Sequence, residues 1–129
     1  MIVYLDASVA VTAITEEPGS AETRRLLDGL ADDAHLLLSG RLLETEMRRT
    51  ANRLGISMSA VDSTLDALAV VEHEKSDFRR AGTFQMRNLG SLDALHLATA
   101  LRVQADVMLT RDRSLAAACE AEGLALLDA

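Results

Sequence analysis

The chain has 129 residues, of which 49% are hydrophobic and 26% charged, and its formal net charge is −7. This length predicts one domain, over residues 1–129, with its own buried core, and the composition excludes intrinsic disorder. The single cysteine excludes a disulfide framework and a cysteine-based zinc site, and the acidic balance argues against binding of nucleic acid by bulk electrostatics. Because of this cysteine usage we expect the protein in a reducing cytoplasm. Asp6 interrupts the first apolar stretch too early for a signal peptide, and no apolar run approaches the length of a membrane span.

Two patterns of apolar residues alternate along the chain. Short apolar runs predict buried strands, and longer segments with apolar residues three or four positions apart predict amphipathic helices. In chain order we expect a strand over 2–5, helices over 8–15 and 20–31, a strand over 35–39, helices over 41–54 and from Ser57 or Ser59 to about 68, a strand over 69–72, helices over 75–86 and 91–103, a strand over 106–110, a helix over 112–122 and a strand over 124–127. This order predicts an α/β fold in which helices cover both faces of a mainly parallel sheet.

Four acidic residues direct attention to one edge of this sheet. Sheets of this kind bind ligands beyond the carboxyl ends of their strands, and Asp6 and Asp112 each follow a strand. Asp93 and Glu46 lie within helices and reach that edge only if the fold brings their helices there. Each acid taken alone is more often a turn former, a helix cap or a surface ion-pair partner. However, Asp6 and Asp93 stand among apolar residues, where a charge needs a partner or a metal.

The sequence around these acids resembles a known family. The matching stretches are VYLDAS over residues 3–8, LETEMRR over 43–49, SLDALHLATA over 91–100 and LTRD over 109–112. In these motifs, and in its length and order of elements, the chain resembles the PIN-domain ribonucleases and in particular the VapC-like toxins of type II toxin–antitoxin pairs. The Ser-Leu-Asp-Ala-x-His-x-Ala block is the most specific of the four stretches, and the first motif alone is weak.

The resemblance implies a three-layer α/β/α sandwich with an acidic pocket that holds Mg²⁺ or Mn²⁺. It implies a metal-dependent endoribonuclease that hydrolyses RNA phosphodiester bonds. The catalytic residues that it carries over are Asp6, Glu46, Asp93 and Asp112, with Asp6, Asp93 and Asp112 as metal ligands. Ser8 and Thr110 are expected to hydrogen-bond the pocket acids or the phosphate.

Two features of the acidic set bear on this assignment. Glu44 is the rival of Glu46 for the mid-chain role, but Arg48 stands four residues after it and offers a local partner. Some family members carry a further acid one helical turn after the last aspartate, and here that position is Ala116. A second metal ion is therefore less expected than the first.

The chemistry of the residues agrees with the resemblance. Mg²⁺ takes oxygen ligands, and no cluster of cysteine and histidine residues suggests zinc. A bound metal would activate a water, and Glu46 or Asp112 could accept its proton. Arginine suits phosphate contact, so Arg48, Arg49, Arg111 and Arg113 are candidates for holding RNA, with a solvated surface as the equal alternative. We interpret His96, His35 and His73 as structural.

The resemblance also implies partners, and other functions compete with it. A VapB-like antitoxin, encoded separately, and a second copy in a homodimer are the expected protein partners. A catalytically inactive PIN-like interaction module is the first alternative, although the four acids argue against it. A receiver-type phosphoryl-transfer domain is the second, but it needs a lysine after a late strand, and the only lysine, Lys75, precedes a helix. An RNA cleavage assay with an EDTA control separates these functions.

Overall fold

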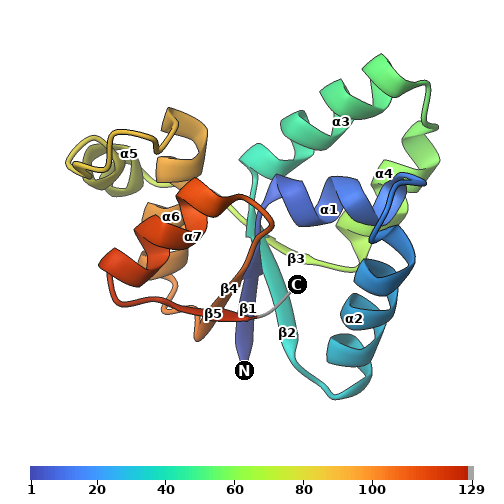
Figure 1. Ribbon diagram of the computed structural model, residues 1–129, viewed down its shortest axis with the longest axis horizontal. Helices are drawn as coiled ribbons and strands as arrows, with labels where there is room; N and C mark the ends of the chain where they lie inside the picture. Colours follow the sequence, from blue (N-terminus) through green and yellow to red (C-terminus); the bar gives the residue numbers. More distant parts are fainter. Residues whose placement is uncertain (128–129) are drawn as a thin grey trace.

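The computed structural model describes residues 1–127 as five strands and seven helices (Figure 1). Residues 128–129, the end of the predicted domain, lie outside the described part. In chain order the elements are β1 (Ile2–Leu5), α1 (Ala7–Ile14), α2 (Ser20–Asp32), β2 (Leu36–Gly40), α3 (Leu42–Leu54), α4 (Met58–Asp66), β3 (Ala69–Val71), α5 (Lys75–Ala81), α6 (Ser91–Arg102), β4 (Val107–Leu109), α7 (Arg113–Ala121) and β5 (Ala125–Leu127). Within residues 1–127, no helix is both long and apolar enough to span a membrane.

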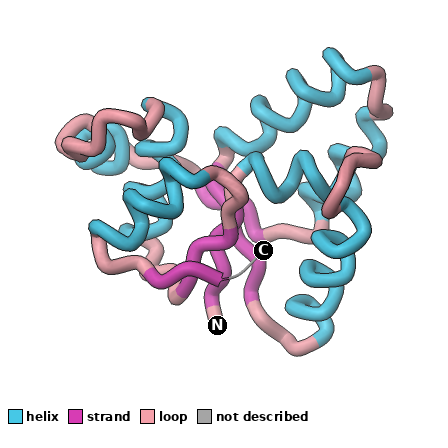
Figure 2. Tube along the Cα trace, in the orientation of Figure 1, coloured by secondary structure: helices cyan, strands magenta, loops and turns pink. Residues whose placement is uncertain are grey.

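The strands form one parallel sheet in the order β3-β2-β1-β4-β5, which Figure 2 shows at the centre of the molecule. Helices α1 to α4 lie on one side of this sheet, and α5 to α7 lie on the other (Figure 1). Successive residues of a strand face opposite sides, so Val3 and Leu5 join the core under the first group of helices while Tyr4 joins the core under the second. The predicted α/β/α sandwich is therefore confirmed.

Most predicted elements are present with ends shifted by one or two residues, but one helix is shorter than expected. The helix predicted over 75–86 ends at Ala81, where Gly82 caps it and Thr83 Oγ1 donates to the carbonyl of Arg80 at 2.7 Å. Phe78 is consequently 58% exposed. Helix α2 begins at Ser20 as predicted, and the residue that precedes it, Gly19 with φ +92°, is the N-cap.

The parallel topology brings the ends of the central strands together. β1 is in the middle of the sheet and pairs with β2 on one side and β4 on the other. β2 ends at Gly40, where an added Cβ would lie 2.7 Å from the Tyr4 hydroxyl and would also clash with the His73 ring. Only glycine therefore fits where the chain leaves β2 to enter α3. The residues that follow β1, β2 and β4 form the edge described next.

Candidate functional site

Asp6, at the end of β1, is a buried carboxylate that hydroxyl groups surround. It is 2% exposed. Its Oδ1 accepts from Ser8 Oγ at 2.7 Å and caps α1 by accepting from the Val9 amide, and its Oδ2 accepts from Thr110 Oγ1 at 2.8 Å. Burial raises the pKa of Asp6 above its ordinary value, although these hydrogen bonds oppose the shift. The carboxylate is thus fixed in orientation and has no cationic partner among the described residues.

The loop after β4 holds Asp112 next to this group. Thr110 Oγ1 accepts from the Asp112 amide at 3.0 Å, and Ser8 Oγ accepts from the Arg111 amide at 2.9 Å. The Asp112 side chain caps α7, because its Oδ1 accepts from the Leu115 amide at 2.9 Å. The two strand ends are therefore joined by the Ser8 and Thr110 hydroxyl groups, which contact Asp6 and the backbone next to Asp112.

Glu46 reaches the site from α3 through a buried histidine. His96 Nε2 lies 2.6 Å from Glu46 Oε1, and His96 Nδ1 lies 2.6 Å from the Tyr4 hydroxyl. Burial raises the pKa of Tyr4, so its hydroxyl keeps its proton and can donate to Nδ1. With Nδ1 accepting from Tyr4, the proton-bearing nitrogen assigned from this network is Nε2, which donates to the Glu46 carboxylate. Tyr4 and His96 therefore fix one oxygen of Glu46.

Asp93 lies in the first turn of α6 and is partly buried. Its pKa is raised to about 6, first because burial disfavours the charged form and then because Asp112 and Asp6 add negative charge nearby, with a smaller effect from Glu46. No described residue donates a hydrogen bond to the Asp93 carboxylate. The mutual repulsion indicates that the fold gathers all four predicted acids into one region.

Glu44, the rival of Glu46, belongs to a surface network instead. Its carboxylate pairs with Arg48 at 3.0 Å and with Arg41 at 3.2 Å, and hydrogen bonds from these arginines lower its pKa. Arg48 also pairs with Asp62 of α4 at 2.9 Å. Glu44 is therefore neutralised by cations, and Glu46 is not.

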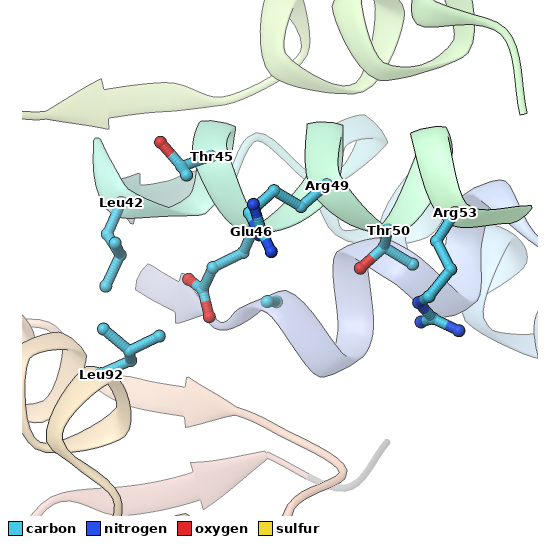
Figure 3. A pocket seen from close by; sticks show the side chains of 8 residues that line it. Leu42, Thr45, Glu46, Arg49, Thr50, Arg53 and Leu92 are labelled. Atoms are coloured by element: carbon cyan, nitrogen blue, oxygen red, sulfur yellow. The ribbon is translucent and has the colours of Figure 1, made fainter.

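An open groove of about 560 Å³ begins at Glu46 (Figure 3). Glu46, Arg49 and Arg53 line it from α3, and Ala7 and Leu92 line it from the starts of α1 and α6. Within residues 1–127, no three His, Cys, Asp or Glu side chains are already close enough together to form a ready-made metal site. What the site offers a cation is a set of hard carboxylate oxygens.

Three residues that contribute to this region were missed as functional candidates from the sequence. Tyr4 reads as a core residue, His96 as a packed histidine and Arg53 as a surface charge. The signal for the first two is their place inside the matching motifs, two residues before Asp6 and three after Asp93. Arg53 carried no comparable signal.

Comparison with known proteins identifies the family to which this sequence belongs. The sequence matches the PIN domain family over residues 3–121, and no curated protein sequence matches it. Its fold is similar to that of VapC20 from Mycobacterium tuberculosis, a sarcin-ricin loop cleaving toxin, with a TM-score of 0.74, 14% identity and 95% of each chain covered.

Two further solved structures have the same fold. VapBC2 from Rickettsia felis, bound to a DNA fragment from its promoter, matches with a TM-score of 0.75 and 17% identity, over 99% of this chain and 98% of that one. PAE2754 from Pyrobaculum aerophilum matches with a TM-score of 0.66 and 20% identity, over 99% and 90% of the two chains. The chain therefore belongs to the PIN-domain family and has the fold of the VapC toxins.

Proposed function

We propose that this protein is a divalent-metal-dependent endoribonuclease that acts as the toxin of a toxin–antitoxin pair. The observation that carries the proposal is the group of four uncompensated acids at one edge of the sheet, where Asp112 and Asp6 help to raise the pKa of Asp93 to about 6. Acids gathered without a cation destabilise a fold, so their arrangement is better explained by a ligand than by stability. Membership of the PIN-domain family supports the same reading.

The residues fit a divalent metal ion. Asp6, Asp93 and Asp112 would hold Mg²⁺ or Mn²⁺, which prefer carboxylate oxygens. Ser8 and Thr110 donate to Asp6 and thereby fix its orientation, as second-layer partners of a metal ligand do. A bound ion orients a water molecule and offsets negative charge on the scissile phosphate.

Glu46 is the residue that we assign as general base. Its Oε1 is fixed by His96, so Oε2 is the oxygen left to accept a proton from the attacking water. The water oxygen forms a bond to phosphorus, the bond from phosphorus to the leaving oxygen breaks, and the proton of the water passes to Glu46. Asp112 is less suited to this role because one of its oxygens caps α7.

A VapB-like antitoxin and a second copy of the chain are the protein partners that we propose. VapBC2 from Rickettsia felis, whose fold is similar, is a complex bound to promoter DNA. The net charge of −7 and the acidic site favour an antitoxin segment that places a cationic side chain among the carboxylates. Co-expression with the neighbouring small open reading frame should rescue growth, and the two proteins should purify together.

A cleavage assay tests the enzymatic part of the proposal. The purified protein is incubated with a mixture of single-stranded and structured RNAs, with Mg²⁺, with Mn²⁺ or with EDTA. We expect cleavage with either metal and none in EDTA. Unchanged cleavage in EDTA would contradict the metal requirement, whereas no cleavage under any condition would favour an inactive interaction module.

A further inference from the structure

The arginines near the site fall into two groups that the sequence does not separate. Arg48 is held by Glu44 and Asp62, and the Arg111 guanidinium donates to Thr12 Oγ1 at 2.8 Å. The charge of Arg48 is therefore paired within the protein, and the head group of Arg111 is held by a hydroxyl. These two residues are poor candidates for binding a ligand that must approach the carboxylates.

Arg49 and Arg53 belong to the second group. Neither side chain forms an ion pair with any residue in the described part of the chain. Both line the same groove as Glu46, and in Figure 3 Arg53 points away from α3 on the side of the Glu46 carboxylate, whereas the Arg49 side chain runs back along α3 toward Glu46. The wall that α3 forms therefore carries two arginines without an ion-pair partner in the described part of the chain, next to the Glu46 carboxylate.

The spacing of these residues suits a polymer with a regular charge. Positions 46, 49 and 53 differ by three and four residues, so they share one face of a helix. Arg49 and Arg53 are about 6 Å apart along the helix axis, because each residue of an α-helix rises about 1.5 Å. Adjacent phosphates of an extended nucleic-acid strand are separated by a comparable distance. The long, flexible side chains at these two backbone positions can each reach one phosphate, and the planar fork of arginine binds phosphate oxygens in pairs.

The charge of the whole protein makes such a contact necessary. The chain carries a net charge of −7, and the four acids face the RNA where it must bind. A polyanion is repelled by this field unless cationic side chains hold it locally. We propose that Arg49 and Arg53 bind consecutive phosphates on one side of the scissile bond and so position the RNA strand across the carboxylates. This inference rests on the proposed ribonuclease function and adds the path of the substrate.

The test compares two double variants that remove the same charge. Arg49→Ala/Arg53→Ala removes the proposed contacts, and Arg79→Ala/Arg80→Ala removes two exposed arginines from α5 as the matched control. Binding of a short fluorescein-labelled single-stranded RNA of randomised sequence is measured by fluorescence anisotropy in EDTA, over a series of salt concentrations. Cleavage of the same RNA is measured with Mg²⁺.

We expect the first variant to bind RNA at least tenfold more weakly than wild type at low salt. The slope of log K against log salt should fall in magnitude by about 1.4, which is about 0.7 for each lost phosphate contact on a single strand. In the cleavage assay KM should rise while kcat at saturating RNA changes little, because phosphate contacts position the substrate. Arg49→Lys/Arg53→Lys should retain most of the salt slope, and the α5 control should behave like wild type.

Each other result has a definite meaning. Equal behaviour of the groove variant and wild type overturns the inference and leaves the ribonuclease function standing. An equal loss in the groove and α5 variants overturns it as well, because net charge alone would then explain the effect. Unchanged RNA binding with loss of the co-expressed antitoxin would assign the groove to the protein partner instead. If wild-type protein neither binds nor cleaves RNA, the proposed function itself fails.

Discussion

Two polar networks lie next to each other in the protein, each built around a histidine whose two ring nitrogens are hydrogen-bonded. The first runs from the Tyr4 hydroxyl through His96 to Glu46, with both distances 2.6 Å. His96 is completely buried, but the network ends at a carboxylate that lines an open groove. No cation among the described residues neutralises that end.

The second network has a different end. His73 Nε2 accepts from the Leu42 amide at 3.0 Å, and His73 Nδ1 lies 2.7 Å from Thr99 Oγ1. Thr99 donates to Asp77 at 3.1 Å, and the Arg102 guanidinium donates to both Asp77 oxygens, at 2.9 and 3.1 Å. Burial lowers the pKa of His73, so the ring is neutral and can accept from the first amide of α3. This network ends at an ion pair between Asp77 and Arg102.

The difference separates an acid that maintains the fold from acids that are available to a ligand. Burial alone would raise the pKa of Asp77, but hydrogen bonds from Arg102, the Glu74 amide and Thr99 outweigh it and lower the pKa below the ordinary value. The pKa of Asp93 is raised instead, because its carboxylate is partly buried and other acids lie nearby. A buried acid with its own cation is a structural element, and a group of acids without one is a functional candidate.

The largest expected effect is on cleavage by Asp93→Asn. This change keeps the shape of the side chain and removes one of the repelling charges. We expect RNA cleavage to fall by more than the 10–100-fold that is typical of losing a second-layer partner of a metal ligand. Thermal stability without metal should be equal to or higher than that of wild type, because the repulsion is reduced. Measurements of cleavage and of metal-free melting on one preparation check both statements.

A lowered metal-free melting temperature together with retained cleavage would show that Asp93 is a structural helix-dipole partner. Such a role would be worth about 0.3–1 kcal/mol. Metal added to wild type at about one hundred times its dissociation constant should raise stability by roughly 2.7 kcal/mol. The same addition to Asp93→Asn should raise it less.

Asp77→Asn should lower the stability of the protein and leave its cleavage rate nearly unchanged. It removes the nearer of the two carboxylates that pair with Arg102, leaving Glu74 at 3.4 Å, and weakens the N-terminal capping of α5, where Asp77 accepts from the Glu74 amide. Removing one partner of a buried ion pair costs about 3–5 kcal/mol, and we expect the lower end of this range because the Arg102 side chain is 28% exposed. Urea unfolding measures the loss. At temperatures where the variant is folded, its cleavage rate should stay within a few-fold of wild type, and a hundredfold loss would contradict the structural assignment.

His96→Leu tests the network that ends at Glu46. The change removes the donor to Glu46 and the acceptor for the Tyr4 hydroxyl, so cleavage should fall about 10–100-fold, with the effect on kcat larger than on KM. His96→Gln retains an N–H donor for Glu46 and should recover part of the activity. If both variants lose stability equally but cleave RNA like wild type, His96 does not position Glu46.

The fold could be predicted because its strands are short, continuous apolar runs between helical segments. The strand-end rule then placed Asp6 and Asp112 at one edge. For Asp93, only the family resemblance predicts that its helix, α6, lies at the same edge, because spacing along the sequence does not show where a helix packs. The helix predicted over 75–86 is too long, because the chain turns at Gly82, and its aromatic residue Phe78 is exposed rather than part of the core.

Contacts between distant residues were beyond the sequence. Glu46 and His96 are fifty positions apart, so nothing local predicts that they touch. Arg48 and Arg49 are adjacent and chemically identical, yet only Arg48 meets Asp62 of α4. Which arginine is free depends on how two helices pack, and helix packing is a property of the folded molecule.

The smallest expected effect is a difference in how pH changes stability. The pKa of Asp93 rises from 3.8 to about 6 on folding, so the folded protein binds its proton more tightly than the unfolded chain. Stability from this group is complete below pH 3.8 and is lost as pH rises toward 6. The loss should be on the order of 1 kcal/mol, since water screens a partly exposed carboxylate.

Asp77 should act with the opposite sign, because its lowered pKa gives stability that is present above the unfolded pKa and is lost as pH falls. Metal-free urea unfolding across this pH range, for wild type, Asp93→Asn and Asp77→Asn, separates the two contributions. Relative to wild type, Asp93→Asn should gain stability toward pH 6 and Asp77→Asn should lose least in acid. Parallel curves for wild type and Asp93→Asn would mean that neither burial nor the neighbouring acids raise the pKa of Asp93, and the argument for a cation among these acids would lose its electrostatic basis.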